Sequence, residues 1–182
     1  MASVAGVTTL LLARHGETDW NRELRIQGSS DIELNDLGRA QAHALAQELE
    51  HVDLDAIYAS DLSRARATAE AVAASHALDV QLDQRLRERS FGSWEGLTRE
   101  DIAALPEGSQ HDGESDDEVR ERVLEAVQAI ADAHPGEQVL VVSHGGALNT
   151  LWHHALGERV ERWANCAVYK LALRDGAYVA VD

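Results

Sequence analysis

The sequence has little cysteine and no long apolar run. Its 182 residues contain one cysteine, Cys166, which excludes an internal disulfide and any zinc site built from several cysteines. The longest apolar run, Val4 to Ala13, is interrupted by Gly6, Thr8 and Thr9, and it is shorter than the ~18 residues that a transmembrane helix needs. The amino terminus shows no basic segment followed by a cleavable apolar stretch, so no signal peptide is predicted. We therefore expect a cytoplasmic protein.

Basic charge is also scarce. The chain has 16 Lys+Arg against 32 Asp+Glu, a formal net charge of −16, and Lys170 is the one lysine among the basic residues. An acidic surface repels nucleic-acid phosphates and anionic membranes, so neither is an expected partner. The composition, 45% hydrophobic and 26% charged, is typical of a globular protein. No repeat or linker divides the chain, so residues 1–182 are expected to form one domain.

Stretches typical of buried strands alternate with helical patterns, which predicts an α/β fold with a mainly parallel sheet. Strands are expected at about 7–13, 55–59, 80–86, 138–142, 167–173 and 177–181, and helices at about 36–50, 61–75, 115–133 and 146–156. Three of these helices begin at side chains that commonly cap helices: Asn35 or Asp36, Ser60 with Asp61, and Ser115 with Glu118.

Side chains suited to phosphate chemistry follow four of the predicted strands. In open α/β sheets, ligands bind beyond the carboxyl ends of the strands. Two arginines, two histidines and one carboxylate therefore come to one edge of the sheet, where helix amino termini would add amide N–H groups. Each residue alone would be ordinary, and their joint placement predicts a cationic site for a phosphate group and its leaving group. These residues are Arg14, His15, Arg64, Glu88 and His144.

Ordered sequence blocks surround these residues. Arg14-His15-Gly16-Glu17-Thr18-Asp19-Trp20-Asn21 is followed in order by Gln27-Gly28 and by blocks at 34–38, 60–69, 86–96, 113–115 and 143–146. Together they resemble the histidine phosphatase superfamily, the phosphoglycerate mutase-like proteins, over about residues 8–150. The resemblance implies a three-layer α/β sandwich, with helices on both faces of a mainly parallel central sheet.

The resemblance also implies roles. His15 would be the nucleophile that forms a phosphohistidine, with its other ring nitrogen donating to a nearby carbonyl. Glu88 would protonate the leaving oxygen and then activate water. No metal or cofactor is expected. Arg14, Arg64 and His144 would hold the phosphate oxygens, and Asn21, Gln27, Gly28 and Gly145 would line the substrate side.

The spacing between Glu88 and His144 distinguishes mutases from phosphatases within this superfamily. It is 144 − 88 = 56 residues, whereas the mutases carry an insertion there that helps close the site. The short spacing favours hydrolysis of a small phosphate monoester with release of inorganic phosphate. A cofactor-dependent phosphoglycerate mutase, a phosphohistidine protein phosphatase and a non-catalytic phosphate-binding module are the alternatives, and a homodimer is left open.

Other polar features are not assigned to the site. His153 and His154 have no companion ligands at metal-binding spacing, and the acidic segment from Asp112 to Glu118 lacks the spacing of a calcium loop. Trp152 and Trp163 are expected in the core, and Trp94 either in the core or at a pocket wall. Specificity is expected to come from the loop after Gln27, from residues 89–110 and from the helix after His144.

Overall fold

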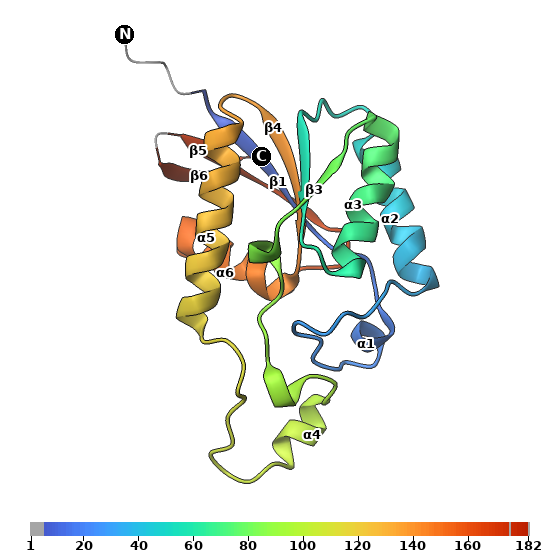
Figure 1. The fold of residues 1–182 in the computed structure, drawn as a ribbon, viewed down its shortest axis with the longest axis vertical. Helices are drawn as coiled ribbons and strands as arrows, with labels where there is room; N and C mark the ends of the chain where they lie inside the picture. The colour runs from blue at the N-terminus through green and yellow to red at the C-terminus, as the bar shows by residue number, and fades with distance from the viewer. Residues whose placement is uncertain (1–5, 175, 182) are drawn as a thin grey trace.

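A six-stranded sheet forms the centre of the fold (Figure 1), which a computed structural model describes for residues 6–174 and 176–181. Its strand order is β3-β2-β4-β1-β5-β6. β1, β2, β3 and β4 pair in parallel, whereas β5 and β6 are antiparallel additions, so the prediction of a mainly parallel sheet is confirmed. The strands are β1 Thr8–Arg14, β2 Ala56–Ala59, β3 Val80–Leu82, β4 Gln138–Ser143, β5 Val168–Arg174 and β6 Ala177–Val181.

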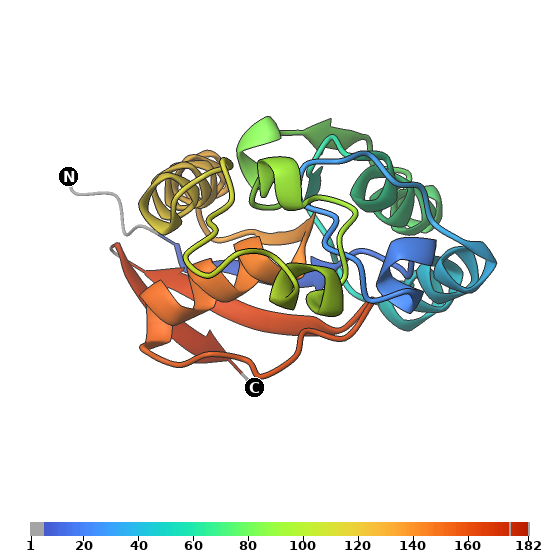
Figure 2. The same ribbon diagram turned by 90° about the horizontal axis from the view of Figure 1, so that it is seen from below.

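Helices cover both faces of this sheet, as expected. α2 and α3 pack together on one side and α5 and α6 on the other (Figure 1). Two short helices, α1 and α4, lie beyond the end of the sheet that faces the viewer in Figure 2. The helices are α1 Asp19–Arg22, α2 Asp36–Leu49, α3 Ser63–His76, α4 Arg99–Ala103, α5 Asp116–Ala133 and α6 Gly145–Leu156, with 3₁₀ helices η1 Gln84–Leu86 and η2 Gly92–Trp94.

The central strand β1 divides the core into two clusters. Leu10 and Leu12 pack in the cluster that contains α5 and α6, and Leu11 and Ala13 pack in the cluster that contains α2 and α3. Successive strand residues point to opposite faces, so a strand covered on both faces must be apolar throughout. Trp163 is buried in the first cluster, as predicted.

Other core predictions have mixed outcomes. Trp152 is half-buried and packs against the first cluster rather than inside it. Trp94 is half-buried in η2, with its ring centroid 5.4 Å from that of His111.

Two predicted element boundaries are wrong. α3 begins at Ser63 rather than at Ser60 or Asp61, because Ser60 Oγ accepts the N–H of Leu62 while Asp61 binds Arg87. The strand predicted at 80–86 ends at Leu82. The next residue, Asp83, caps η1: its side chain accepts the N–H of Arg85. The predicted caps at Asn35 and at Ser115 with Glu118 are confirmed.

The short helices α1 and α4 were not predicted. Each begins with a reciprocal capping box, formed by Thr18 with Asn21 and by Thr98 with Asp101. Such a box satisfies two backbone N–H groups, which lets these short helices persist without a large buried face. Across the described residues, no helix is both long enough and apolar enough to cross a bilayer.

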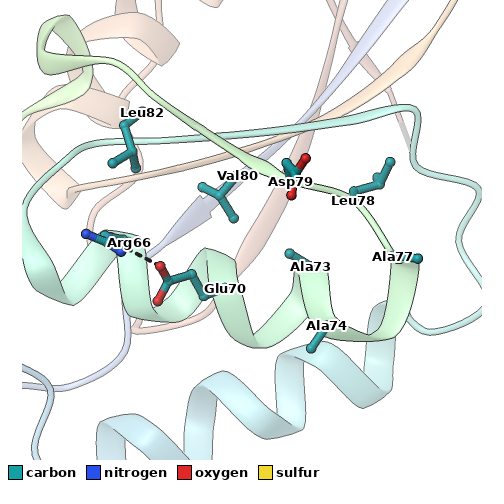
Figure 3. A pocket seen from close by; sticks show the side chains of 9 residues that line it. All are labelled: Arg66, Glu70, Ala73, Ala74, Ala77, Leu78, Asp79, Val80 and Leu82. Carbon is teal, nitrogen blue, oxygen red and sulfur yellow. Dashed lines mark hydrogen bonds and ion pairs between the residues drawn. The ribbon is translucent and has the colours of Figure 1, made fainter.

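A hollow of about 800 Å³ lies between α3 and β3 (Figure 3). Arg66 and Glu70 pair along α3 at 2.7 Å, opposite Val80 and Leu82 of the edge strand. None of the residues predicted for the phosphate site lines this hollow. It is therefore a separate surface feature at the edge of the sheet.

Candidate active site

The carboxyl ends of β1 and β4 bring the two predicted histidines together. Arg14 is in register with Ser143 in the parallel pair, and the N–H of His15 donates to the carbonyl of Ser143 at 3.0 Å. His144 follows immediately, and the ring centroids of His15 and His144 lie 5.1 Å apart. Residues far apart in the sequence thus meet because their strands are neighbours.

The ring of His15 is held in one tautomer. Its side chain is buried, and Nδ1 lies 2.6 Å from the carbonyl oxygen of Gly16. A carbonyl can only accept, so Nδ1 carries the proton and Nε2 keeps its lone pair; the predicted carbonyl partner is confirmed. Burial, with Arg14 and Arg64 close by, holds the pKa of His15 well below its ordinary value. The neutral imidazole that a nucleophile requires is therefore the stable form.

His144 is also buried and is oriented by a hydroxyl group. Its Nε2 lies 2.9 Å from Ser60 Oγ, so Ser60 positions this ring rather than capping a helix. Burial, followed by the charge of Arg64, keeps the pKa of His144 well below its ordinary value. Its Nδ1 has no hydrogen-bond partner within the described part of the chain.

Arg64 is the largest fully buried side chain in the described structure, and each of its terminal nitrogens donates one hydrogen bond to a backbone carbonyl. Nη1 donates to the carbonyl of Ser30 at 2.7 Å and Nη2 to that of Gly28 at 2.8 Å. Burial lowers its pKa to about 10, while Glu88 opposes this shift. Arg14 is anchored in the same way, by Nη1 donating to the carbonyl of Trp163 at 2.6 Å.

Three buried nitrogens around His15 remain without partners in the described residues: Arg14 Nε, Arg64 Nε and His144 Nδ1. We call these three side chains the anion cradle. A buried polar atom without a partner costs about 1–3 kcal/mol, so a cluster of them indicates a ligand that satisfies them. Two guanidinium groups and an imidazole suit the oxygens of a tetrahedral anion.

Glu88 lies at the amino terminus of α6. Its carboxylate accepts the N–H of Gly146 and that of Ala147, each at 3.0 Å. A Cβ at Gly146 would lie 2.5 Å from Glu88 Oε1, so a side chain at this position would displace the carboxylate from these amides. The α6 amides predicted to face the ligand thus bind the carboxylate instead. The predicted acid and His144 are consequently tied to the same helix start.

The residues predicted to line the substrate side hold the surrounding turns. Asn21 Oδ1 accepts the N–H of Thr18 at 3.2 Å, and Gln27 Oε1 accepts the hydroxyl of Thr18 at 2.8 Å. Gly28 has a φ of 53° and offers its carbonyl to Arg64. A Cβ at Gly145 would lie 3.6 Å from Arg14 Nε, an ordinary contact beside the cradle. Their contact with substrate stays a prediction.

Glu95 supports the cradle indirectly, through the turn that binds Arg64. Its carboxylate accepts the N–H of Ser29 and that of Ser30, each at 2.9 Å. The turn that supplies both carbonyls to Arg64 is thereby fixed. Glu95 lies in the segment 89–110, which is expected to contribute to specificity, and its described contacts with Ser29 and Ser30 are structural.

Arg122 is a functional candidate that sequence reasoning missed. From α5 it donates to the carbonyls of Arg85, Arg87 and Glu88 at 2.8, 2.7 and 3.1 Å. It also forms a two-point ion pair with Glu114, at 2.6 and 2.8 Å. One guanidinium group thus holds the segment 85–90, which we call the Glu88 segment. Glu114 lay in a recognised block without an assigned role, whereas no pattern pointed to Arg122.

Asn165 was also missed. Its Nδ2 donates to the carbonyl of His15 at 2.9 Å and to Asn21 Oδ1 at 3.3 Å. It therefore ties the loop before β5 to His15, the predicted nucleophile. Among the described residues, no group of three or more His, Cys, Asp or Glu is placed to hold a metal ion.

An α/β sheet with a neutral imidazole, an unsatisfied cationic cradle and a fixed carboxylate defines a phosphoryl-transfer protein. The family comparison narrows this class. The family model of the histidine phosphatase superfamily (branch 1) matches residues 10–182, and the chain belongs to that superfamily.

Relatives and solved structures agree with this assignment. The chain is 39% identical over 186 residues to a probable phosphoglycerate mutase, GpmB, of Cronobacter sakazakii, covering 93% of this chain and 86% of the relative. It resembles a mycobacterial glucosyl-3-phosphoglycerate phosphatase complexed with VO3, with a TM-score of 0.83, 32% identity and 97% of each chain covered. A phosphoserine phosphatase from Entamoeba histolytica, complexed with phosphoserine, gives a TM-score of 0.84 and 27% identity, covering 96% of this chain and 95% of that one.

Proposed function

We propose that the protein hydrolyses a small phosphate monoester through a phosphohistidine on His15. The single observation that carries this proposal is the arrangement around that ring. Nδ1 is bound to the carbonyl of Gly16, the ring of His144 lies 5.1 Å from that of His15, and each side chain of the anion cradle has a buried nitrogen without a partner in the described residues. Solved relatives that act on glucosyl-3-phosphoglycerate and phosphoserine support a small phosphorylated metabolite as the substrate.

In the first step, His15 Nε2 attacks phosphorus and the bond to the ester oxygen breaks. Glu88, in its protonated form, transfers its proton to that oxygen, and the alcohol leaves. The anion cradle holds the three non-bridging oxygens and stabilises the charge they carry in the transition state. In the second step, water attacks the phosphohistidine while Glu88 accepts its proton. Inorganic phosphate and the original imidazole are the products.

The decisive experiment traps the intermediate. A ³²P-labelled substrate that is quenched during turnover should leave a label on the protein that is stable to alkali and labile to acid, as a phosphohistidine is. His15→Ala should remove both the label and phosphate release while the circular dichroism spectrum stays unchanged. An alkali-labile label, or substantial turnover by His15→Ala, would refute the nucleophile. Turnover should also survive chelation by EDTA, because the proposed charges and nucleophile are all side chains.

Phosphoglycerate mutase activity is the second candidate, because a relative with 39% identity is named a probable phosphoglycerate mutase. The two activities differ in the acceptor of the phosphohistidine, which is water in a phosphatase and a second substrate hydroxyl in a mutase. The test incubates the enzyme with 3-phosphoglycerate and a bisphosphoglycerate primer. Release of inorganic phosphate supports the phosphatase. Rapid isomerisation with little free phosphate would reverse the assignment.

A further inference from the structure

The backbone directly after His15 is held by side chains from distant segments. The carbonyl of His15 accepts a hydrogen bond from Nδ2 of Asn165 at 2.9 Å, and the N–H of Gly16 donates to Thr68 Oγ1 at 3.0 Å. Thr68 is fully buried on α3, and its hydroxyl donates to the carbonyl of Arg64 at 2.8 Å. The peptide between His15 and Gly16 is therefore fixed at both of its polar atoms.

The next peptide, between Gly16 and Glu17, contacts the imidazole itself. Its carbonyl oxygen is the atom that lies 2.6 Å from His15 Nδ1, and its N–H donates to Gln41 Oε1 of α2 at 2.8 Å. Gln41 is half-buried. Because an N–H can only donate, the amide oxygen of Gln41 rather than its nitrogen faces this peptide. One peptide plane thus joins Gln41 to the ring of His15.

The start of α2 sets the position of Gln41. A Cβ at Gly16 would collide with the carbonyl of Gly38, and a Cβ at Gly38 would collide with the carbonyl of Glu17, so the two backbones are in direct contact. Asn35, the N-cap of α2, donates its N–H to the same Glu17 carbonyl, from 3.0 Å. Gln41 follows Gly38 by three residues and so lies on the same face of the helix. Its amide is therefore held against the segment that follows His15.

The hydrogen bond from His15 Nδ1 to the Gly16 carbonyl changes during the proposed reaction. When the lone pair of Nε2 forms the bond to phosphorus and the bond to the ester oxygen breaks, the ring keeps its Nδ1 proton and becomes positively charged. A charged donor makes a stronger hydrogen bond than a neutral one, so this bond is stronger in the transition state than before it. It already raises the pKa of His15, against the burial and the arginine charges that lower it.

Gln41 acts on the acceptor of this bond. Hydrogen bonds that share a peptide group polarise one another, so the bond from the Glu17 N–H to Gln41 increases the negative charge on the Gly16 carbonyl oxygen. We propose that Gln41 is a positioning residue that stabilises, through the Gly16–Glu17 peptide, the positive charge that His15 acquires when it is phosphorylated. The inference rests on the proposed function, because it requires His15 to receive the phosphoryl group.

The first test is the ¹H–¹⁵N resonance of His15 Nδ1–H, which is assigned by its loss in His15→Ala. Gln41→Met removes the acceptor and keeps the length of the side chain, so the proton resonance should move upfield, toward a weaker hydrogen bond. Gln41→Glu makes the acceptor stronger, so the same resonance should move downfield. Gln47→Met is the matched control, because Gln47 is exposed on the same helix.

The second test measures the two steps of the proposed reaction separately, by rapid quench with a ³²P-labelled substrate. Labelling of the protein should be about fivefold slower in Gln41→Met, because the charge that develops on the ring is less stabilised. Loss of the label should be as fast as in the wild type or faster, because this step starts from the charged ring and ends with the neutral one. A general structural defect would slow both steps, so the two rates distinguish it from the proposed role.

The inference is overturned if Gln41→Met moves the resonance no more than Gln47→Met does, or if it slows labelling and label loss alike. If circular dichroism shows that Gln41→Met does not fold, Gln41→Glu decides by itself: a downfield shift supports the inference, and any other result overturns it. If the wild type neither becomes labelled nor releases phosphate from any ester, the proposed function fails instead. The resonance, which is measured without substrate, then decides whether Gln41 acts on His15.

Discussion

The anion cradle and the Glu88 segment serve the same proposed reaction but are built differently. Arg14 ends β1, His144 follows β4, and Arg64 is in the first turn of α3, so the cradle rests on regular elements. Glu88 follows a 3₁₀ helix, is half-buried, and lies on a backbone that the side chain of Arg122 holds through three carbonyls. The cradle depends on strand register, and the Glu88 segment depends on one side-chain network.

The two parts are therefore expected to fail in different ways. In the proposed mechanism, a defect in the cradle removes stabilisation of the phosphoryl group, which every phosphate ester shares. In the same mechanism, a defect in the Glu88 segment removes proton transfer to the leaving group, which matters most for alkyl esters with poor leaving groups. The ratio of kcat for an alkyl phosphate to kcat for an aryl phosphate therefore reports which part is damaged.

Replacing Arg64 should give the largest effect. Arg64→Lys removes the planar fork that reaches the carbonyls of Gly28 and Ser30, and kcat/KM should fall by about 10³-fold for alkyl and aryl phosphates alike. Steady-state kinetics with both esters measures this. Arg66→Lys, an exposed ion-pair position two residues further along α3, is the control. A loss confined to alkyl esters would assign Arg64 to the leaving group instead.

Acid should destabilise the protein through the two buried histidines. Their folded-state pKa values lie below the ordinary value of about 6.5, so the unfolded state binds more protons at acid pH. The free energy of unfolding should be level above that pH and then fall by up to about 1.4 kcal/mol per pH unit for each histidine. Urea unfolding at pH 7, 6 and 5 measures this slope.

His144→Gln should reduce the slope to about half, because one of the two histidines is removed. The carboxylates with lowered pKa values, among them Asp61 and Glu114, lose their contribution only at lower pH and so do not obscure this window. A slope that is unchanged in His144→Gln would contradict the assignment.

Arg122→Gln should selectively damage the Glu88 segment. With the three carbonyls released, kcat for an alkyl phosphate should fall about 30-fold, and kcat for an aryl phosphate no more than about threefold. Arg120→Gln is the control, because Arg120 lies on the same helix and pairs only with Asp117 in the described contacts. Equal losses for both esters would show a general structural defect.

The ion pair that joins the two parts should have the smallest effect. Arg87 donates to both carboxylate oxygens of Asp61 at 2.7 and 2.6 Å, linking the Glu88 segment to the start of α3. Asp61→Asn should lower the free energy of unfolding by about 1 kcal/mol, because the pair is partly exposed. Thermal unfolding, with Glu70→Gln as the exposed control, checks this. A loss above about 3 kcal/mol would mean that the link is structurally essential.

Local sequence patterns were sufficient for most of the fold. β1 and β4 were predictable because both of their faces are buried, so their apolar character is continuous. The start of α3 was misplaced because Ser60 and Asp61 are typical caps whose oxygens have other partners. Those partners, His144 and Arg87, come from distant parts of the chain and leave no trace in local spacing.

The candidate site shows the same division between residues that local motifs identify and residues that act on distant parts of the chain. His15, His144 and Arg64 were found because short motifs at strand ends and at a helix start hold them. Arg122 and Asn165 were not found, because each acts on backbone carbonyls of another segment. A carbonyl is present at every residue, so no residue pattern identifies such an acceptor.

The central position of β1 has a consequence for biosynthesis. Its parallel partner β4 is made long after it, because Thr9 pairs with Gln138 and Arg14 with Ser143. During translation β1 is synthesised long before β4 and lacks this parallel neighbour. The sheet therefore forms late, and until then the apolar strand β1 is exposed to aggregation. The same pairing brings His15 to His144. A nascent chain therefore gains its proposed reaction centre only when β1 pairs with β4, so enzymatic turnover would report completed folding.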